Sequence, residues 1–412
     1  MALDPSAYRR LDGALAGVDA ELARDYPGEP GSRQPVHTVY VAADRFTADL
    51  PANWGARALA ALTEHLPDAA ALAEVLGVPA TIAAEVLPLV RAKLAAEPIE
   101  DLRIDFEDGY GAPPDEAEDA TARQAGAALA GVTLPFRGLR IKSLEPATRR
   151  RGIRTLDEFL GALLGGGQLP AGFVVTLPKV THIGQVAAFV ELCAELEKAH
   201  GLAAGELRFE LQIETPQAIL AADGTAAVAR MVHAGAGRLV GLHYGTYDYS
   251  AACGVAAPYQ STEHAVADHA KAVMQLAAAG TGVRLSDGST NVLPTGSAPA
   301  VLAAWRLHAR LVRRALERGY YQGWDLHPAQ LVTRYGATYA FYRAGLPAAC
   351  ERLRDYLASS QGGVLDEPAT AQAMASLLVR GLRCGALTAA EVSERAGVTE
   401  AVLDGLFRRR VG

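Results

Sequence analysis

The stretch LRIDFEDG at residues 102–109 begins as an apolar strand and ends in acidic side chains. Five further stretches repeat this order of an apolar run followed by charged or amide residues: LRIKS (139–143), VVTLPKV (174–180), FELQIETP (209–216), LVGLHYGTYDY (239–249) and GWDLHP (323–328). In a parallel β-barrel the active site lies at the carboxyl ends of the strands. The six stretches together therefore predict one catalytic rim.

Segments with the apolar spacing of helices separate these strands. Strands that alternate with helices predict βαβ units and a parallel sheet. The number of repeats is close to eight, with the seventh strand expected at TGVRL (281–285). We therefore expect an α/β fold of the (β/α)8 TIM-barrel type rather than an open, doubly wound sheet.

The chain is expected to carry helical segments at both ends of this barrel. We assign residues 1–35 to an N-terminal helical arm, 36–345 to the barrel and 346–412 to a C-terminal helical extension. Residues 388–410 have helix-turn-helix spacing, and Arg408 to Arg410 could contact nucleic-acid phosphates. The same spacing suits a helix pair that packs on the barrel or on another subunit, which we favour.

The composition limits the possible partners. The chain of 412 residues carries a formal net charge of −7, whereas nucleic-acid binders concentrate basic residues on one face. Its four cysteines include no CxxC pair, which argues against a disulfide framework or a thiolate zinc site. We find neither a signal peptide nor an apolar run long enough for a membrane helix. We therefore expect a cytoplasmic protein with no membrane or nucleic-acid partner. The negative net charge is still compatible with a small anionic substrate, because a local cluster of Arg and Lys outweighs net charge inside a cleft.

Alternation along the strands separates charged from apolar side chains. Residues two apart share one face of a strand, which groups three pairs: Asp105 with Glu107, Arg140 with Lys142, and Gln212 with Glu214. Helices cover the outer face of such a sheet, so the charged face should point into the barrel. Charges buried there must pair with each other or bind a metal.

Glu214 and Asp248 are the candidate metal ligands, because each lies just beyond a predicted strand. Two carboxylates with open coordination positions suit Mg²⁺, with Mn²⁺ also possible. Two other interpretations stay open. Glu214 could form a salt bridge with Arg140 or Lys179, and Asp248 could cap a helix or shape a turn.

Arg140 is the natural group to bind a carboxylate or a developing enolate, because its guanidinium is permanently charged and bidentate. A structural ion pair with Glu107 or Asp108 is equally compatible with the residue types. Lys179 could act electrostatically or as a Schiff-base amine, although nearby carboxylates disfavour the neutral amine. His327 could act as an acid or base, or bond a backbone carbonyl.

The order of motifs resembles a known family. DFEDG, RIKS, TLPKV, QIETPQA, GTYDYSAACG and DLHPAQL are similar, in this sequence order, to the motifs of the HpcH/HpaI aldolase and citrate lyase β-subunit family. That family has a pyruvate-kinase-like (β/α)8 barrel, and the resemblance spans residues 105–345. QIETP followed by GTYDY also resembles malate synthase, a more distant relative.

The resemblance implies an enzyme, a Mg²⁺-dependent carbon–carbon lyase or aldolase acting through a metal-stabilised enolate of a 2-oxo acid or hydroxyacyl-CoA. It also implies a homo-oligomer. The roles carried over are metal ligation by Glu214 and Asp248, catalysis by Arg140, Asp105 and Asp108, and substrate binding by Glu107, Lys142, Lys179 and His327. The alternatives are a malate-synthase-like condensing enzyme, a phosphoenolpyruvate- or pyruvate-handling enzyme, or a ligand-sensing regulator with a C-terminal helix-turn-helix.

Three features depart from the family pattern. Lys142 stands where the family has asparagine, and Asp44-Arg45 follows the first strand where the HpcH type has a histidine. The interval between Glu214 and Asp248 is also longer than in the family. The missing histidine leaves the general base unassigned.

Overall fold

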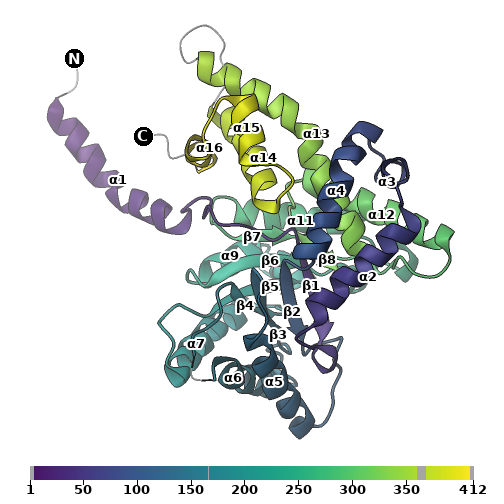
Figure 1. Cartoon of the computed structure of the whole chain (residues 1–412). Helices are drawn as coiled ribbons and strands as arrows, with labels where there is room; N and C mark the ends of the chain where they lie inside the picture. The colour runs from purple at the N-terminus through teal and green to yellow at the C-terminus, as the bar shows by residue number, and fades with distance from the viewer. Residues whose placement is uncertain (1–3, 166, 360–367, 409–412) are drawn as a thin grey trace.

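The computed structural model describes residues 4–165, 167–359 and 368–408. Its centre is a parallel sheet in the order β7-β6-β5-β4-β3-β2-β1-β8, and a bridge between Ser286 and Gln322 closes the ring. The strands are β1 (His37–Ala42), β2 (Asp101–Asp105), β3 (Phe136–Arg140), β4 (Phe173–Leu177), β5 (Arg208–Ile213), β6 (Leu239–Tyr244), β7 (Arg284–Ser286) and β8 (Gly323–Asp325). The expected TIM barrel is confirmed, including its short seventh strand (Figure 1).

Helices follow the strands and cover the outside of the ring (Figure 1). In α6, for example, the apolar residues that recur at helical spacing are buried: Leu156, Phe159, Leu160 and Leu163. The helices and short turns up to the last strand are η1 (Ala43–Arg45), α2 (Leu50–His65), α3 (Ala69–Leu76), α4 (Ala80–Ala96), α5 (Asp115–Ala130), α6 (Arg149–Leu164), α7 (Ile183–His200), α8 (Pro216–Ile219), α9 (Ala227–Ala234), α10 (Thr246–Ala252), η2 (Ala257–Tyr259), α11 (Ala265–Ala278) and α12 (Ala298–Glu317).

The inside of the barrel is charged. Arg103 of β2 donates two hydrogen bonds of 3.0 Å to the carboxylate of Glu210 on β5, although β2 and β5 are not neighbours. The contact must therefore cross the interior. His243 on β6 lies 3.0 Å from the same carboxylate. Leu102 and Leu211, which alternate with these residues, are fully buried on the outer side. The period-2 separation of charge and apolar surface thus holds in the folded chain.

The C-terminal part is helical: α13 (Gln330–Ser359), α14 (Pro368–Cys384), α15 (Ala389–Ala396) and α16 (Glu400–Phe407). α13 runs continuously across the expected boundary at residue 345, so the barrel and the extension share one helix.

The helix-turn-helix spacing corresponds to α15 and α16, joined at Gly397. Four of their apolar residues are buried in the chain's own core: Val392, Ala396, Leu403 and Phe407. Arg408 pairs with Asp404 at 2.8 Å, and the other two arginines predicted to contact phosphates, Arg409 and Arg410, lie outside the described residues. The two helices therefore have an internal packing role.

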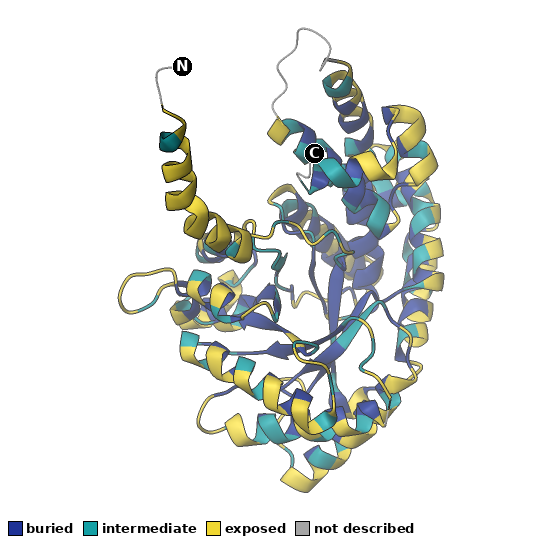
Figure 2. Cartoon of the chain, turned by 90° about the vertical axis from the view of Figure 1, so that its left-hand side faces the viewer, coloured by how far each residue is buried: buried dark blue, intermediate teal, exposed yellow. Residues whose placement is uncertain are grey.

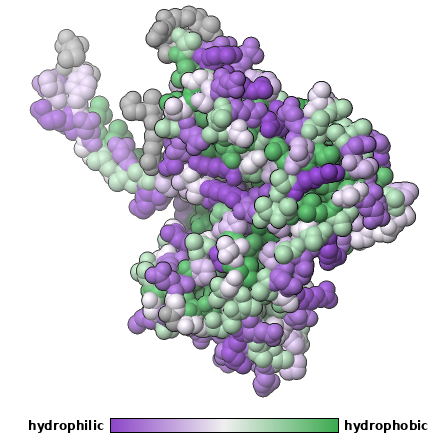
Figure 3. Space-filling view, viewed as in Figure 1, coloured by the Kyte–Doolittle hydropathy of each residue, from purple (hydrophilic) through white to green (hydrophobic). Residues whose placement is uncertain are grey.

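The N-terminal arm is α1 (Pro5–Asp25), which has no buried residue and projects from the body (Figures 1 and 2). Its large apolar side chains are 47–60% exposed at alternating spacings of three and four residues: Tyr8, Leu11, Leu15, Val18 and Leu22. We call this set the α1 stripe, and Figure 3 shows hydrophobic side chains along the same arm. Such spacing places all five on one face of the helix.

Among the described residues, no single helix is long and apolar enough to cross a membrane. Only α3 and α4 meet the length and composition criteria together, as a pair bent by 105°.

A glycine inside β3 offers a test of the barrel packing. A Cβ added at Gly138 would overlap the carbonyl oxygen of Val174 on β4, so Gly138→Ala should lower the free energy of unfolding by about 1–3 kcal/mol through overpacking. Gly13→Ala in α1, where a Cβ meets nothing within 4 Å, is the matched control. Urea unfolding followed by circular dichroism should show a lower midpoint for the first variant only; equal midpoints would contradict this register.

Candidate active site

Arg140 and Asp105 form the centre of the site at the carboxyl ends of β3 and β2. The two residues are directly paired in register. Nε and Nη2 of Arg140 each donate to a different oxygen of Asp105, both at 2.7 Å. The Asp105 carboxylate also accepts backbone N–H bonds from Glu107 and Gly109, at 3.0 Å each. Both side chains are buried, so Asp105 fixes the position of the guanidinium.

Gln212 connects Arg140 to Glu214. Nη1 of Arg140 donates a 3.0 Å bond to Oε1 of Gln212, and Nε2 of Gln212 donates to the Glu214 carboxylate. Our residue assignments omitted Gln212. Its position two residues before Glu214 on β5 was the available signal, because residues two apart share a face.

Glu214 is a buried carboxylate whose charge is poorly compensated. It is 1% exposed, and its Oε1 accepts a 2.7 Å bond from the backbone N–H of Lys179. Burial raises its pKa to about 8, and the negative charges of Asp248 and Glu107 add to the shift against the opposing charge of Arg140. Gly245 leaves room for this carboxylate, because a Cβ there would lie 2.8 Å from Oε2.

Asp248 lies in the first turn of α10, directly after β6, and is exposed. The charge of Asp248 is one of the causes that raise the pKa of Glu214. Among the described residues, no group of three or more His, Cys, Asp or Glu side chains is arranged to hold a metal. Mg²⁺ needs only one or two carboxylates because it keeps several waters. The uncompensated Glu214 and the accessible Asp248 therefore fit a hard divalent cation.

Lys179 connects the acidic residues that follow β2 to Glu214, which follows β5. Its φ of 52° is in the left-handed region, and this conformation accompanies the N–H bond to Glu214. Its ammonium group binds Glu107 and, at 2.8 Å, Asp108. Although burial opposes it, these bonds raise the pKa of Lys179 above its ordinary value. The amine stays protonated, which disfavours a Schiff base.

Glu107 and Asp108 have different environments. Glu107 is buried, lies 3.4 Å from Nη1 of Arg140, and burial raises its pKa. The side chain of Asp108 is 56% exposed. Burial opposes the shift, but the bond and charge of Lys179 lower the pKa of Asp108. Of the predicted acidic residues on this loop, Asp108 is the one that solvent reaches.

Two of the predicted substrate-binding residues, Lys142 and His327, lie outside the network of hydrogen bonds around Arg140. The ammonium of Lys142 donates to the backbone carbonyls of Phe106 and Gly111, at 2.6 and 2.7 Å, and lies 3.5 Å from Glu118 of α5. It anchors the loop after β2 instead of sharing the face of Arg140. His327 contacts Arg57 and the N–H of Ala329, and these contacts do not connect it to the Arg140 network.

Aromatic side chains that the sequence analysis did not assign form one wall of the site. The Arg140 guanidinium lies 4.9 Å from the ring centre of Tyr40 and 6.0 Å from that of Trp324. Trp324 also donates a 3.1 Å bond to His243. Cation–π contacts of this kind favour the charged guanidinium in a site with little water.

The raised pKa of Glu214 predicts how cation binding depends on pH. A Mg²⁺ ion at Glu214 must displace the proton, so its affinity should rise about tenfold per pH unit up to pH 8 and then level off. Calorimetric titration of Mg²⁺ between pH 6 and 9, in buffers of different ionisation heat, measures both the affinity and the proton released.

Two variants control this titration. Glu214→Gln should abolish Mg²⁺ binding, whereas Glu74→Gln, at an exposed position of α3, should leave it unchanged. Mg²⁺ binding that survives in Glu214→Gln would remove Glu214 from the metal site.

The fold is similar to solved structures of low sequence identity. A citrate lyase from Burkholderia xenovorans LB400 gives a TM-score of 0.58 with 19% identity, covering 88% of this chain and 95% of that chain. Haloferax volcanii malate synthase in its magnesium/glyoxylate complex gives 0.47 and 18%, covering 92% and 98%. The protein CitE from Mycobacterium tuberculosis, in complex with magnesium and acetate, gives 0.46 and 18%, covering 85% and 98%.

The similarity to the citrate lyase structure confirms the expected resemblance at the level of the fold. No curated protein sequence matches the chain. A family model described as "Domain of unknown function (DUF6986)" matches residues 15–411. Because this match covers nearly the whole sequence, the chain belongs to the DUF6986 family.

Proposed function

We propose that this protein is a Mg²⁺-dependent carbon–carbon lyase or aldolase that acts next to a carbonyl group of a 2-oxo acid or acyl-CoA. The observation that carries the proposal is Glu214, a buried carboxylate whose pKa is raised by burial and by the charge of Asp248. The side-chain amide of Gln212 accepts a hydrogen bond from Arg140 and donates one to Glu214, so it links the two residues. A cation site next to a fixed guanidinium suits a substrate oxygen on which negative charge develops.

Glu214 and Asp248 would hold the cation. When bound, Mg²⁺ would supply Lewis acidity at the substrate's carbonyl oxygen and orient the substrate. Mn²⁺ takes similar oxygen ligands.

Arg140 would contribute a second positive charge to the same substrate oxygen or to a carboxylate of the substrate. Asp105 holds it with two 2.7 Å bonds, so the charge needs little reorganisation during the reaction. Because Asp105 already accepts four hydrogen bonds, its role is to position Arg140.

Asp108 is the candidate proton acceptor among the acidic residues of this loop. Its lowered pKa keeps it ionised at neutral pH, and its exposure leaves it open to substrate. Lys179 binds both Glu107 and Asp108 and thereby holds the loop toward the cation ligands. Glu107 and Lys179 would therefore shape the substrate side of the site.

Hydrogen exchange tests enolate formation without knowledge of the second substrate. With Mg²⁺ in D2O, the protein should exchange the methyl hydrogens of pyruvate or acetyl-CoA for deuterium, as measured by proton NMR. Glu214→Gln should lose this exchange and Glu74→Gln should keep it. Faster incorporation with acetyl-CoA, and consumption of added glyoxylate, would assign a condensing reaction of the malate synthase kind. Exchange that is equal in wild type and Glu214→Gln would refute the proposed chemistry.

The Asp105–Arg140 pair can be tested separately from the cation site. Asp105→Asn should reduce the exchange rate about 10²- to 10³-fold, because the guanidinium loses its fixed position. Its Mg²⁺ affinity should stay within about twofold of wild type, since the ligand carboxylates remain. Asp119→Asn, on the surface of α5, is the matched control. A large loss of Mg²⁺ binding in Asp105→Asn would place Asp105 in the metal site instead.

The expected homo-oligomer is supported by the α1 stripe. Alternating spacings of three and four residues are the pattern with which two copies of one helix pack against each other. We propose that α1 pairs with α1 of a second copy, which would cover side chains now 47–60% exposed. Light scattering should show that Leu15→Glu with Leu22→Glu has the mass of one 43.2 kDa chain. Asp12→Asn with Asp19→Asn is the control, and an unchanged mass in the leucine variant would exclude this contact.

A further inference from the structure

A cavity lies at the end of the barrel where the strands begin, opposite the candidate active site. It has a volume of about 710 Å³ and is bounded by the loops before β3 to β7 and by the linker at residues 27–32. Its apolar walls include Phe136, Leu169, Phe173, Leu239 and Val240, and Arg284 stands at one side. We call it the lower cavity. Small-molecule sites commonly have volumes of about 300–1,000 Å³, apolar walls and a few polar groups.

Arg284 is one of four charged residues that line the lower cavity, together with Arg208, Glu29 and Glu206. It begins β7 and also lines the two neighbouring cavities on the other side of the linker. Its guanidinium donates a 2.6 Å bond to the hydroxyl of Ser32 and lies 5.6 Å from the ring centre of Phe136. A cation next to an apolar wall is the arrangement expected for a ligand with both an anionic and an apolar part.

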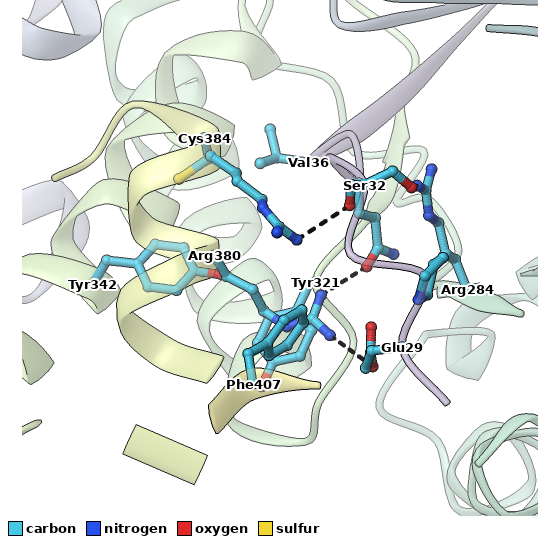
Figure 4. A pocket seen from close by; sticks show the side chains of 12 residues that line it. Glu29, Ser32, Val36, Arg284, Tyr321, Tyr342, Arg380, Cys384 and Phe407 are labelled. Carbon is cyan, nitrogen blue, oxygen red and sulfur yellow. Dashed lines mark hydrogen bonds and ion pairs between the residues drawn. The ribbon is translucent and has the colours of Figure 1, made fainter. Parts of the chain in front are cut away.

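Neighbouring arginines differ from Arg284 in their partners. Arg380 of α14 pairs with Glu29 at 3.1 Å, and Arg383 pairs with Asp404 at 3.0 Å. Figure 4 shows Arg284 beside Ser32 of the linker, with Arg380 stacked near Tyr321 and Phe407. Burial lowers the pKa of Arg284, and the charges of Arg380 and Arg383 add to this shift against the opposing charges of Asp101 and Glu29. Arg284 therefore differs from its two neighbours in that its guanidinium bonds a hydroxyl, that of Ser32, whereas Arg380 and Arg383 bond carboxylates.

We propose that the lower cavity binds a small amphiphilic anion, with one carboxylate or phosphate group at Arg284 and an apolar body along Phe136, Leu169 and Leu239. Arg284 lies at the start of β7, whereas Glu214 follows the end of β5, so the ligand occupies the face opposite the catalytic rim. The chemistry of a TIM barrel takes place at the carboxyl ends of its strands. The lower cavity is thus a binding site without turnover, independent of the proposed reaction.

Calorimetric titration of the full chain with octanoate, octyl phosphate and octan-1-ol tests this site. The three probes share an apolar body and differ in the head group. At least one anion should bind saturably with one ligand per chain, and the tighter anion identifies the head group. Octan-1-ol should bind at least about tenfold more weakly, because a hydrogen bond to a charged group is lost. Binding of octan-1-ol as tight as that of both anions, or no saturable binding of either anion, would overturn the proposal.

Variants locate the binding event. Arg284→Gln should weaken anion binding by about tenfold or more, whereas Arg230→Gln, on the exposed side of α9, should leave it unchanged. Ala171→Trp adds a bulky ring at an exposed lining position and should block binding without touching Arg284. Glu214→Gln should bind the probes as wild type does. Equal binding by Arg284→Gln and Arg230→Gln, or loss of binding in Glu214→Gln, would show that the anion sits elsewhere.

Discussion

The ion pair between Arg140 and Asp105 joins β3 to β2 where the strands end, and the rest of the candidate site is built on it. Asp105 accepts four hydrogen bonds, two from the guanidinium and two from the backbone of the following loop. It therefore fixes Arg140 and the start of the loop that carries Glu107 and Asp108. Breaking one partner of a buried pair typically costs about 3–5 kcal/mol, because the remaining charge is left without compensation.

Further paired charges lie deeper inside the barrel than the pair of Arg140 and Asp105. Below it, Arg103 and Glu210 cross the barrel and His243 completes the contact. A barrel interior usually contains layers of branched apolar side chains, whereas this one is filled by paired charges. Glu214 is the exception, since the charges of two carboxylates, Asp248 and Glu107, raise its pKa. The balance of charge inside the barrel is what separates a structural carboxylate such as Glu210 from the candidate metal ligand.

Much of the charged inner face of the barrel could be predicted from the alternation of charged and apolar residues along the strands. Residues two apart in a strand share a face, so Asp105, Arg140 and Glu214 were correctly expected on the inner face of one barrel. The partner of Arg140 could not be predicted in the same way. The expected partner Glu107 does lie 3.4 Å from Arg140, but the register also places Asp105, which was not expected as a partner, directly opposite it. Lys142 also follows the alternation in sequence, yet its ammonium group bonds the carbonyls of Phe106 and Gly111 and lies near Glu118 of α5, partners that are distant in the sequence and that alternation does not indicate.

The amino-acid sequence by itself determined the barrel, the order of its motifs and which face of each strand is charged. These features follow from local periodicity, which a chain carries without reference to distant residues. Only the tertiary structure decided which charges pair across the barrel, because partners on β2, β3 and β5 meet through strand register and ring closure. It also decided that Arg284, Ser32 and Arg380 meet at the opposite face, since these residues are far apart in the sequence and come together only after the linker and α14 have packed against the barrel.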